Sequence, residues 1–331
     1  MATSTKNILV LGDTHSEWGY LASILYYYRP DMCFILGDFG WWPGWGELPH
    51  YALPRDVLER TEIHFLDGNH ENHISLLGAA PRGHFQAEEI AHNIFYHPRG
   101  STMTLPDGRT VFFAGGAKSL DWRDRKEGKT WFREEILQRD NLPKKLPKVD
   151  IVMSHTIPFE FGIDVGSHKG AGWDFTPDPS QSVLDDVLYE CTPKLWLAGH
   201  LHKRIDGEYN GTEYHILDMV GSGCCLPGEM PNLYWLSGGA GVARDTSGWA
   251  FSDDTILTFL TTGNGLYGCA DMSTLPPDLY ALFEDRRKMY RTLKVNGVKG
   301  IKPGEADSFL NTVCRFNWNA TAAMGDRQKD K

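Results

Sequence analysis

Five short stretches of the sequence end a hydrophobic run with side chains that can bind metal ions. They are LGDTH (11–15), LGD (36–38), LDGNHENH (66–73), SH (154–155) and LAGHLH (197–202). Carboxylate, imidazole and amide oxygen groups suit Mn, Fe, Zn or Mg, and no thiolate is among them. Because side chains at the carboxyl ends of neighbouring strands in one sheet lie close together, we expect these groups to converge on one cavity. The glycines beside them would let the chain leave the strands sharply.

The runs that precede these groups have the pattern of buried strands. Apolar residues fill 7–13, 32–38, 62–69, 110–116, 150–155 and 194–200 without alternating with polar ones. Such runs favour strands that are covered on both faces. Helical patterns lie between some of them, at 17–28 and at 180–191, where Ser180 is the expected cap. This β-α-β alternation predicts an α/β layered fold.

Taken in order, GDTH, GD, GNHE, a lone SH and GHLH resemble the motif series of the calcineurin-like metallophosphoesterase superfamily, in particular its small stand-alone bacterial and bacteriophage members. The resemblance covers residues 12–202. It implies the family fold, a four-layer α-β-β-α double β-sandwich, and a site for two divalent metal ions. Mn is the expected metal, with Fe, Zn, Mg or Ni as alternatives, because sites of this kind accept several metals.

The resemblance also implies a role for each motif residue. The metal ligands would be Asp13, His15 and His202 for the first ion, Asn69, His155 and His200 for the second, and Asp38 as the bridge between them. His70 would face the leaving group as a general acid and would not bind metal. Substrate contacts are expected from Asn69 and His70, with Trp41, Arg99, Lys118 and Arg123 as weaker candidates.

The implied chemistry is hydrolysis of a phosphate ester by hydroxide that the metal ions generate from water. Protein serine/threonine phosphatases carry G-D-x-V-D-R-G where this chain reads GDFGWWPG (37–44), without the second Asp and the Arg. We therefore expect a phosphodiesterase or a small-molecule or nucleotide phosphatase, and the group that orients His70 is unidentified. Two alternatives stay open: a non-catalytic scaffold with the same fold, and a nuclease that acts on short single-stranded nucleic acid.

Two further segments each have two interpretations. GGAKSLDWRDRKEGKTWFREE (115–135) resembles a segment of the small bacterial and phage members, and one of its cations could hold a substrate phosphate. Its other interpretation is a solvated charged loop that leads into a helix over 129–137. Trp41, Trp42 and Trp45 either stack on a nucleobase or pack their loop against the core. Glu71 is expected to support the loop of Asn69 and His70.

Composition limits the partners. The chain has 331 residues, of which 41% are hydrophobic, and a net charge of −10. The negative charge argues against duplex nucleic acid and leaves a small phosphorylated substrate, such as a nucleotide, as the expected partner. No uninterrupted apolar stretch approaches the ~20 residues of a membrane span. The absence of a signal-peptide pattern and six scattered cysteines favour the cytoplasm of a bacterial or phage-infected cell.

We expect a main domain over residues 1–230 and a C-terminal extension over 231–331 that packs on it. Within the main domain, residues 203–219 predict a hairpin that turns at Asn210 and Gly211. The extension is expected to contain a strand at 255–262, an amphipathic helix at 276–293 and a disordered tail. Dimerisation through that helix is an alternative to its packing on the main domain, so a homo-oligomer stays open.

Overall fold

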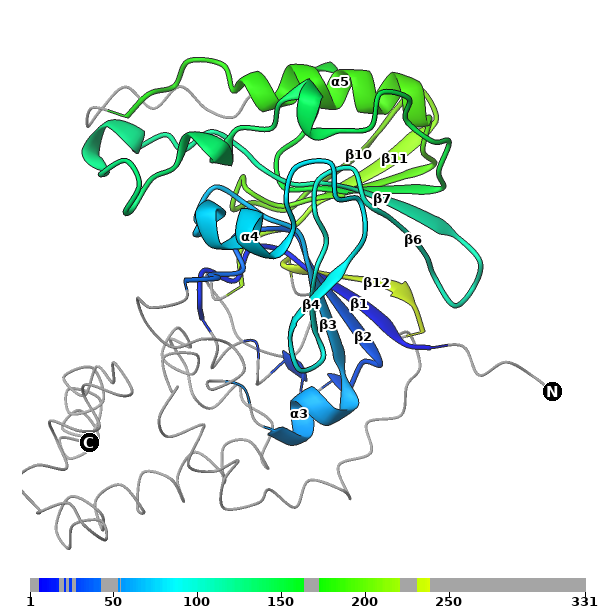
Figure 1. The fold of residues 1–331 in the computed structure, drawn as a ribbon. Helices are drawn as coiled ribbons and strands as arrows, with labels where there is room; N and C mark the ends of the chain where they lie inside the picture. The colour runs from blue at the N-terminus through cyan, green and yellow to red at the C-terminus, as the bar shows by residue number, and fades with distance from the viewer. Residues whose placement is uncertain are drawn as a thin grey trace, which may run out of the picture.

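The computed structural model describes residues 6–17, 21, 24, 25, 28–42, 53, 55–163, 173–220 and 231–238. Within them the chain forms two six-stranded sheets that pack face to face (Figure 1). Of the extension expected over 231–331, the structure describes residues 231–238; its predicted strand at 255–262 and amphipathic helix at 276–293 lie outside the described residues, and so does Trp45.

The first sheet places the early strands side by side. Its order is β12 (Leu233–Ser237), β1 (Ile8–Leu11), β2 (Met32–Ile35), β3 (Glu62–Phe65), β5 (Ile94–Tyr96) and β4 (Glu88–Ala91). The four inner strands run parallel, and β12 and β4 pair antiparallel at the two edges. The predicted strands at 7–13, 32–38 and 62–69 are thus confirmed, whereas β4, β5 and β12 were not predicted.

The second sheet is built in the same way. Its order is β10 (Ile205–Tyr209), β11 (Thr212–Ile216), β9 (Leu195–Ala198), β8 (Ile151–Ser154), β7 (Thr110–Ala114) and β6 (Thr102–Thr104). The four inner strands are again parallel. The predicted hairpin joins β10 to β11, and Asn210 and Gly211 have φ values of 48° and 83°, as a two-residue turn of this kind requires.

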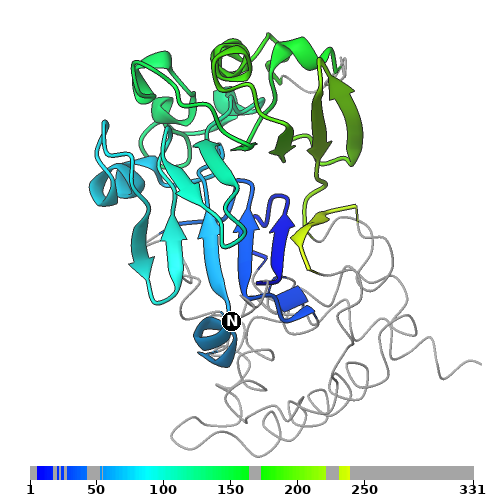
Figure 2. The ribbon, with the colours of Figure 1, turned by 90° about the vertical axis from the view of Figure 1, so that its right-hand side faces the viewer.

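The inner strands are buried on both faces, so each sheet packs against the other sheet on one face and against helices or loops on its other face. In β1, Ile8 and Val10 enter the core between the two sheets, whereas Leu9 and Leu11 enter a second core on the outer face. In the second sheet, Trp196 packs on the outer side with Leu184 of α5 (Pro179–Cys191), the helix that covers this face (Figure 2). The outer core of the first sheet includes residues of α3 (Arg55–Arg60). The predicted four-layer fold is confirmed.

Two local predictions were wrong. The cap of α5 is Asp178 and not Ser180, because the Asp178 side chain accepts a hydrogen bond from the Ser180 backbone at 2.8 Å and Pro179 takes the first helical position. The helix expected over 129–137 is reduced to a single 3-10 turn, η2 (Arg133–Glu135). In this turn the Glu135 carboxylate is buried and accepts hydrogen bonds from Ser119, which precedes the expected helix. On a surface helix it would face solvent.

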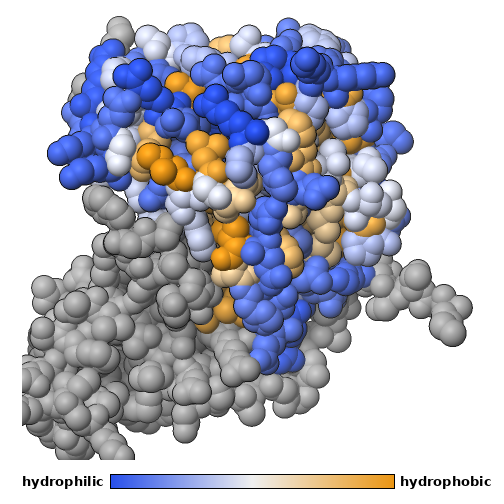
Figure 3. All heavy atoms as spheres, viewed as in Figure 1, coloured by the Kyte–Doolittle hydropathy of each residue, from blue (hydrophilic) through white to orange (hydrophobic). Residues whose placement is uncertain are grey.

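The described residues on the face drawn in Figure 3 do not form one large apolar surface. Figure 3 shows mostly hydrophilic residues over α5 and its neighbouring loops, with hydrophobic ones gathered in smaller groups. The exposed large hydrophobic residues of the described part come from separate elements: Ile74, Phe159, Trp173 and Tyr189. Among the described residues, no helix has the length and apolarity to cross a membrane.

Candidate metal centre

The predicted ligands meet where the carboxyl ends of the two sheets face each other. Asp13, Asp38 and Asn69 follow β1, β2 and β3 of the first sheet, and His155 and His200 follow β8 and β9 of the second. They do not share one sheet, because the chain divides its parallel strands between the two sheets of the predicted double β-sandwich. The convergence itself is present, since three overlapping groups of site residues have potential ligand atoms within 4.8 Å of one another.

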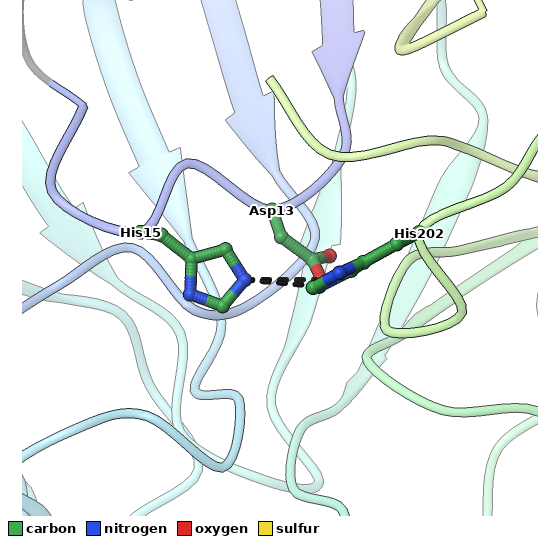
Figure 4. Close-up of side chains that lie close together, drawn as sticks. All are labelled: Asp13, His15 and His202. Carbon is green, nitrogen blue, oxygen red and sulfur yellow. Dashed lines mark hydrogen bonds and ion pairs between the residues drawn. The ribbon is translucent and has the colours of Figure 1, made fainter. Parts of the chain in front are cut away.

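Asp13, His15 and His202 form one of these groups (Figure 4). Nε2 of His202 lies 3.1 Å from Oδ2 of Asp13 and 3.0 Å from Nε2 of His15. Two neutral imidazoles can face each other in this way only if one nitrogen carries a proton and the other does not. A cation between the rings would accept both lone pairs, so the arrangement fits a metal ion.

Asp13, Asp38 and His155 form a second group, which is fully buried. Nδ1 of His155 lies 2.7 Å from the Leu36 carbonyl, and this contact turns Nε2 toward Asn69 Oδ1 at 3.0 Å and Asp38 Oδ2 at 3.5 Å. A histidine that donates one N–H to a carbonyl and aims the other nitrogen at oxygen ligands is typical of metal sites. Without a cation there, Nε2 must hold a proton to avoid facing two acceptors.

The charges in this group fit the same conclusion. Burial alone would raise the pKa of Asp13 and of Asp38, but the His155 imidazolium beside them brings both below their usual range. Burial would lower the pKa of His155, yet the two carboxylates raise it to about 10. Within the described residues, no Lys or Arg pairs with either carboxylate. Two buried carboxylates that depend on histidine protons for their balance are a suitable site for cations.

His200 reaches the site in another way. Its backbone N–H donates to both oxygens of Asp13, at 2.9 and 3.1 Å, and its ring centre lies 4.8 Å from that of His155. Burial lowers the pKa of its ring to about 3, so the ring is neutral and has a free lone pair. His200 is outside the three groups of converging ligand atoms among the described residues, so its predicted role as a ligand stays a prediction.

The backbone around the site is strained. Nine non-glycine residues in the described part of the chain have positive φ, and four of them are predicted ligands: His15, Asp38, His200 and His202. Such conformations cost energy and occur preferentially at functional sites. The neighbouring glycines are needed mainly for space: a Cβ on Gly68 would lie 2.1 Å from Asp38 Oδ1, and one on Gly199 would lie 2.1 Å from Asp13 Oδ1.

A chain of hydrogen bonds fixes the side-chain amide of Asn69. Its Nδ2 donates to Ser119 Oγ at 3.0 Å, and that hydroxyl donates to Glu135 Oε2 at 2.8 Å. The Ser119 backbone N–H donates to Oε1 of the same carboxylate at 2.7 Å. Burial raises the pKa of Glu135 to about 7. This chain holds Nδ2 away from the site and therefore turns Oδ1 toward His155.

Glu71 attaches its own loop, which carries Asn69 and His70, to the segment that follows Asp38. Its carboxylate accepts hydrogen bonds from the backbone of Gly40, at 3.2 Å, and of Trp41, at 2.6 Å, and so holds the segment that follows Asp38. Burial, and then the nearby Asp38 carboxylate, raise the pKa of Glu71 to about 8. The Trp41 ring lies in the core with 7% of its surface exposed, and its Nε1 donates to Ser75. The packing interpretation therefore applies to Trp41, because little of its ring is free for stacking.

The cations predicted to touch substrate are bonded within the fold. Arg99 donates to Asp67 at 2.6 Å and to the carbonyls of residues 134–136. Lys118 lies 3.2 Å from Asp174, whose carboxylate is also 3.4 Å from Arg123. These contacts tie the segment at 115–135 to the rest of the protein. Substrate contact by these three residues stays a prediction without support from their geometry.

His70 borders the cluster and contacts an arginine. Its backbone N–H donates to Asp38 Oδ1 at 2.6 Å, its carbonyl accepts from Trp42 Nε1 at 2.8 Å, and its ring Nε2 lies 4.0 Å from Asp38 Oδ2. Arg125 Nη2 lies 3.0 and 3.1 Å from the two ring nitrogens. Sequence reasoning named Arg125 only as one of five candidate cations in this segment, any of which could hold a phosphate, and it did not single out Ser119 or Glu135. The available signal was that all three belong to the motif at 115–135.

A profile of the family described as calcineurin-like phosphoesterase matches residues 6–204. No curated protein matches the chain. Among solved structures, protein TT1561 of Thermus thermophilus is 14% identical with a TM-score of 0.39, and the match covers 66% of this chain and 92% of that one. The phosphopantetheinyl hydrolase PptH of Mycobacterium tuberculosis is 12% identical with a TM-score of 0.36, with coverage of 65% and 91%. At these identities and TM-scores, neither similarity bears on the substrate of this chain.

Proposed function

The chain belongs to the calcineurin-like phosphoesterase family and is a metal-dependent phosphoester hydrolase, and we propose that its substrates are phosphodiesters or small phosphate monoesters such as nucleotides. We further propose that it uses two divalent metal ions, with Mn preferred. The observation that carries the proposal is the convergence of Asp13, Asp38 and His155 in a buried group that lacks positive charge of its own beyond histidine protons.

The proposed ligands are the predicted ones: Asp13, His15 and His202 at one ion, Asn69, His155 and His200 at the other, and Asp38 between them. Bound divalent ions would supply positive charge that stabilises the phosphoryl oxygens and lowers the pKa of a bound water. The protein's own contribution is to aim these side chains before any substrate arrives. The Leu36 carbonyl orients His155 and the Ser119 hydroxyl orients Asn69.

His70 is proposed to hold a proton for the leaving group. Its ring lies at the edge of the cluster, with about a third of the side chain exposed (34%), so a substrate oxygen can reach it. Its backbone is bonded to Asp38 on one side and to Trp42 on the other, which fixes the ring relative to the proposed bridging ligand. A general acid in such a position typically speeds the reaction by about 10²–10⁴-fold.

Several features support a small substrate in a reducing compartment. The net charge of −10 disfavours long nucleic acid, and the Asp and Arg of the protein-phosphatase motif are absent. Cys33 and Cys191 are free, buried thiols, in keeping with the cytoplasm as the proposed location. No observed feature favours a nuclease or a scaffold over an esterase.

The test is turnover of bis(p-nitrophenyl) phosphate and of p-nitrophenyl phosphate by protein stripped with a chelator and reloaded with Mn²⁺, Mg²⁺, Zn²⁺ or Ni²⁺. We expect both esters to be inert with stripped protein and at least one to be hydrolysed after reloading, most rapidly with Mn²⁺. The ratio of the two rates would then distinguish a diesterase from a monoesterase. Folded protein that hydrolyses neither ester with any of these metals would contradict the proposal.

A further inference from the structure

Arg125 is the one cation of the segment at 115–135 that reaches the metal centre among the described residues. Lys118 and Arg123 bond to Asp174, and Arg133 pairs with Glu127 at an exposed position. Arg125 instead contacts both ring nitrogens of His70. Through His70 it adjoins the group formed by His15, Asp38 and His70.

The contact between Arg125 and His70 satisfies only part of each side chain, because one ring nitrogen of His70 and most of the guanidinium donors take no part in it. A guanidinium carries only donors, and a neutral imidazole offers one acceptor, so Nη2 can bond to one ring nitrogen and not to both. If the ring is protonated, the two groups have only donors and repel each other. Two donor groups that meet at an edge of the site leave room for an acceptor between or beside them, and an anionic oxygen is the acceptor that matches both.

Arg125 is also held in place for such a role. Its Nε donates to Asp121 Oδ2 at 2.8 Å, four residues earlier, across the turn η1 (Trp122–Asp124). Its side chain is 14% exposed, so the charge is largely removed from water. In the described part of the chain no partner is found for its Nη1. A mostly buried guanidinium fixed by one carboxylate, with donors to spare, is suited to bind phosphate oxygens with two parallel hydrogen bonds.

Hydrogen bonds of other residues in the segment connect it to the metal centre. Ser119 and Glu135, at either end of the segment, bond to each other, and Ser119 also accepts from Asn69. We therefore infer that Arg125, positioned by Asp121, binds a non-bridging phosphoryl oxygen of the substrate beside His70. This inference rests on the proposed function of the same site and assigns a chemical role to the motif at 115–135.

The test measures binding of inorganic phosphate to Mn²⁺-loaded protein by titration calorimetry, for wild type, Arg125→Ala, Arg125→Lys, Arg123→Ala and Arg133→Ala. Arg125→Ala should weaken phosphate binding by about 10- to 100-fold, the range expected for losing a charge-assisted pair of hydrogen bonds. Arg125→Lys should bind with intermediate affinity, because a lysine keeps the charge and loses the fork of donors. Arg133→Ala removes the same charge from an exposed position of the same segment, and its affinity should stay within about twofold of wild type.

Metal stoichiometry and thermal unfolding, measured on each variant, show whether the variants fold and load. Phosphate affinity of Arg125→Ala equal to that of Arg133→Ala would overturn the inference. The inference would also be overturned if Arg123→Ala lost phosphate affinity and Arg125→Ala did not, or if the wild-type protein bound no phosphate. Arg125-dependent phosphate binding in a protein that hydrolyses no ester would uphold the inference and reject the proposed function, so the two can fail separately.

Discussion

Replacing Ser119 with alanine tests whether the amide of Asn69 is oriented from a distance. The change removes two hydrogen bonds, the one from Asn69 Nδ2 at 3.0 Å and the one to Glu135 at 2.8 Å, and leaves the backbone bond from residue 119 to Glu135 in place. The Asn69 amide would then be free to turn and to present Nδ2 to the metal centre. Loss of a partner that orients a ligand typically costs about 10- to 100-fold in metal affinity.

The stability cost follows from burial. Asn69, Ser119 and Glu135 are 5%, 1% and 0% exposed, so water cannot readily replace the lost partners. Leaving a buried donor or acceptor unpaired costs roughly 1–3 kcal/mol, and we expect the metal-free Ser119→Ala protein to lose a free energy of unfolding in that range. Ser119→Thr keeps the hydroxyl and should recover most of the metal affinity, which a purely steric role of Ser119 would not explain.

Ser101→Ala is the matched control. Ser101 is fully buried as well, and its hydroxyl has no hydrogen-bond partner among the described residues. Because its replacement removes no hydrogen bond to a described residue, it should lower the free energy of unfolding by less than Ser119→Ala does and should leave metal binding unchanged. Mn²⁺ affinity is measured by titration calorimetry and stability by urea unfolding in chelator. Ser119→Ala protein that binds Mn²⁺ as tightly as Ser101→Ala protein would refute the proposed chain.

Three other predictions concern the centre and the core. Asp38→Asn should abolish metal-dependent turnover by weakening both ions, and full metal occupancy in this variant, measured by elemental analysis, would argue against a bridging role. His70→Ala should keep its metals and slow turnover by about 10²–10⁴-fold, most for poor leaving groups; equal slowing of good and poor leaving groups would exclude proton donation. Burial lowers the pKa of His64 and of His97, whose rings meet at 3.0 Å in the core, so both stay neutral in the fold and take up protons on unfolding. Stability should therefore fall as pH drops below about 6.5, by up to about 1.4 kcal/mol per pH unit for each imidazole. His97→Phe should flatten this dependence in urea unfolding with chelator, and parallel losses in variant and wild type would contradict it.

The strands that could be predicted are those whose pattern is unambiguous. Runs such as ILVL and IVMS are buried on both faces, and their lack of alternation indicates inner parallel strands. The edge strands β4 and β6 read EEIA and TMT, short segments with exposed residues that resemble loops. Their pairing depends on β5 and β7, so no local pattern identifies them. The division of the parallel strands between two sheets is likewise a property of the whole chain.

The site residues likewise fall into those that the sequence could predict and those that it could not. The motif residues were predicted because they end recognisable strands, and the structure brings them together. Ser119, Arg125 and Glu135 lie in a segment with no regular pattern, and their contacts with Asn69 and His70 join residues 50 and 55 positions apart. A charge run is usually a solvated face, and for the exposed Arg133 that expectation describes the structure well. For Arg125 it does not, because a neighbouring carboxylate and burial turn the guanidinium inward.

The metal-free centre carries a cost that explains its dependence on the surrounding loops. Asp13 and Asp38 are buried beside each other, and positive φ at four predicted ligands adds backbone strain. Hydrogen bonds from backbone groups and from a neighbouring segment offset part of this cost: the Leu36 carbonyl on His155, Ser119 on Asn69, and the backbone N–H of His200 on Asp13. If metal ions replace the histidine proton as the balancing charge, binding them should stabilise the fold by an amount that grows with the logarithm of metal concentration over Kd, about 2.7 kcal/mol at a hundredfold excess over Kd. The segments that supply these hydrogen bonds are therefore needed for the geometry of the centre, together with the residues proposed to bind the ions.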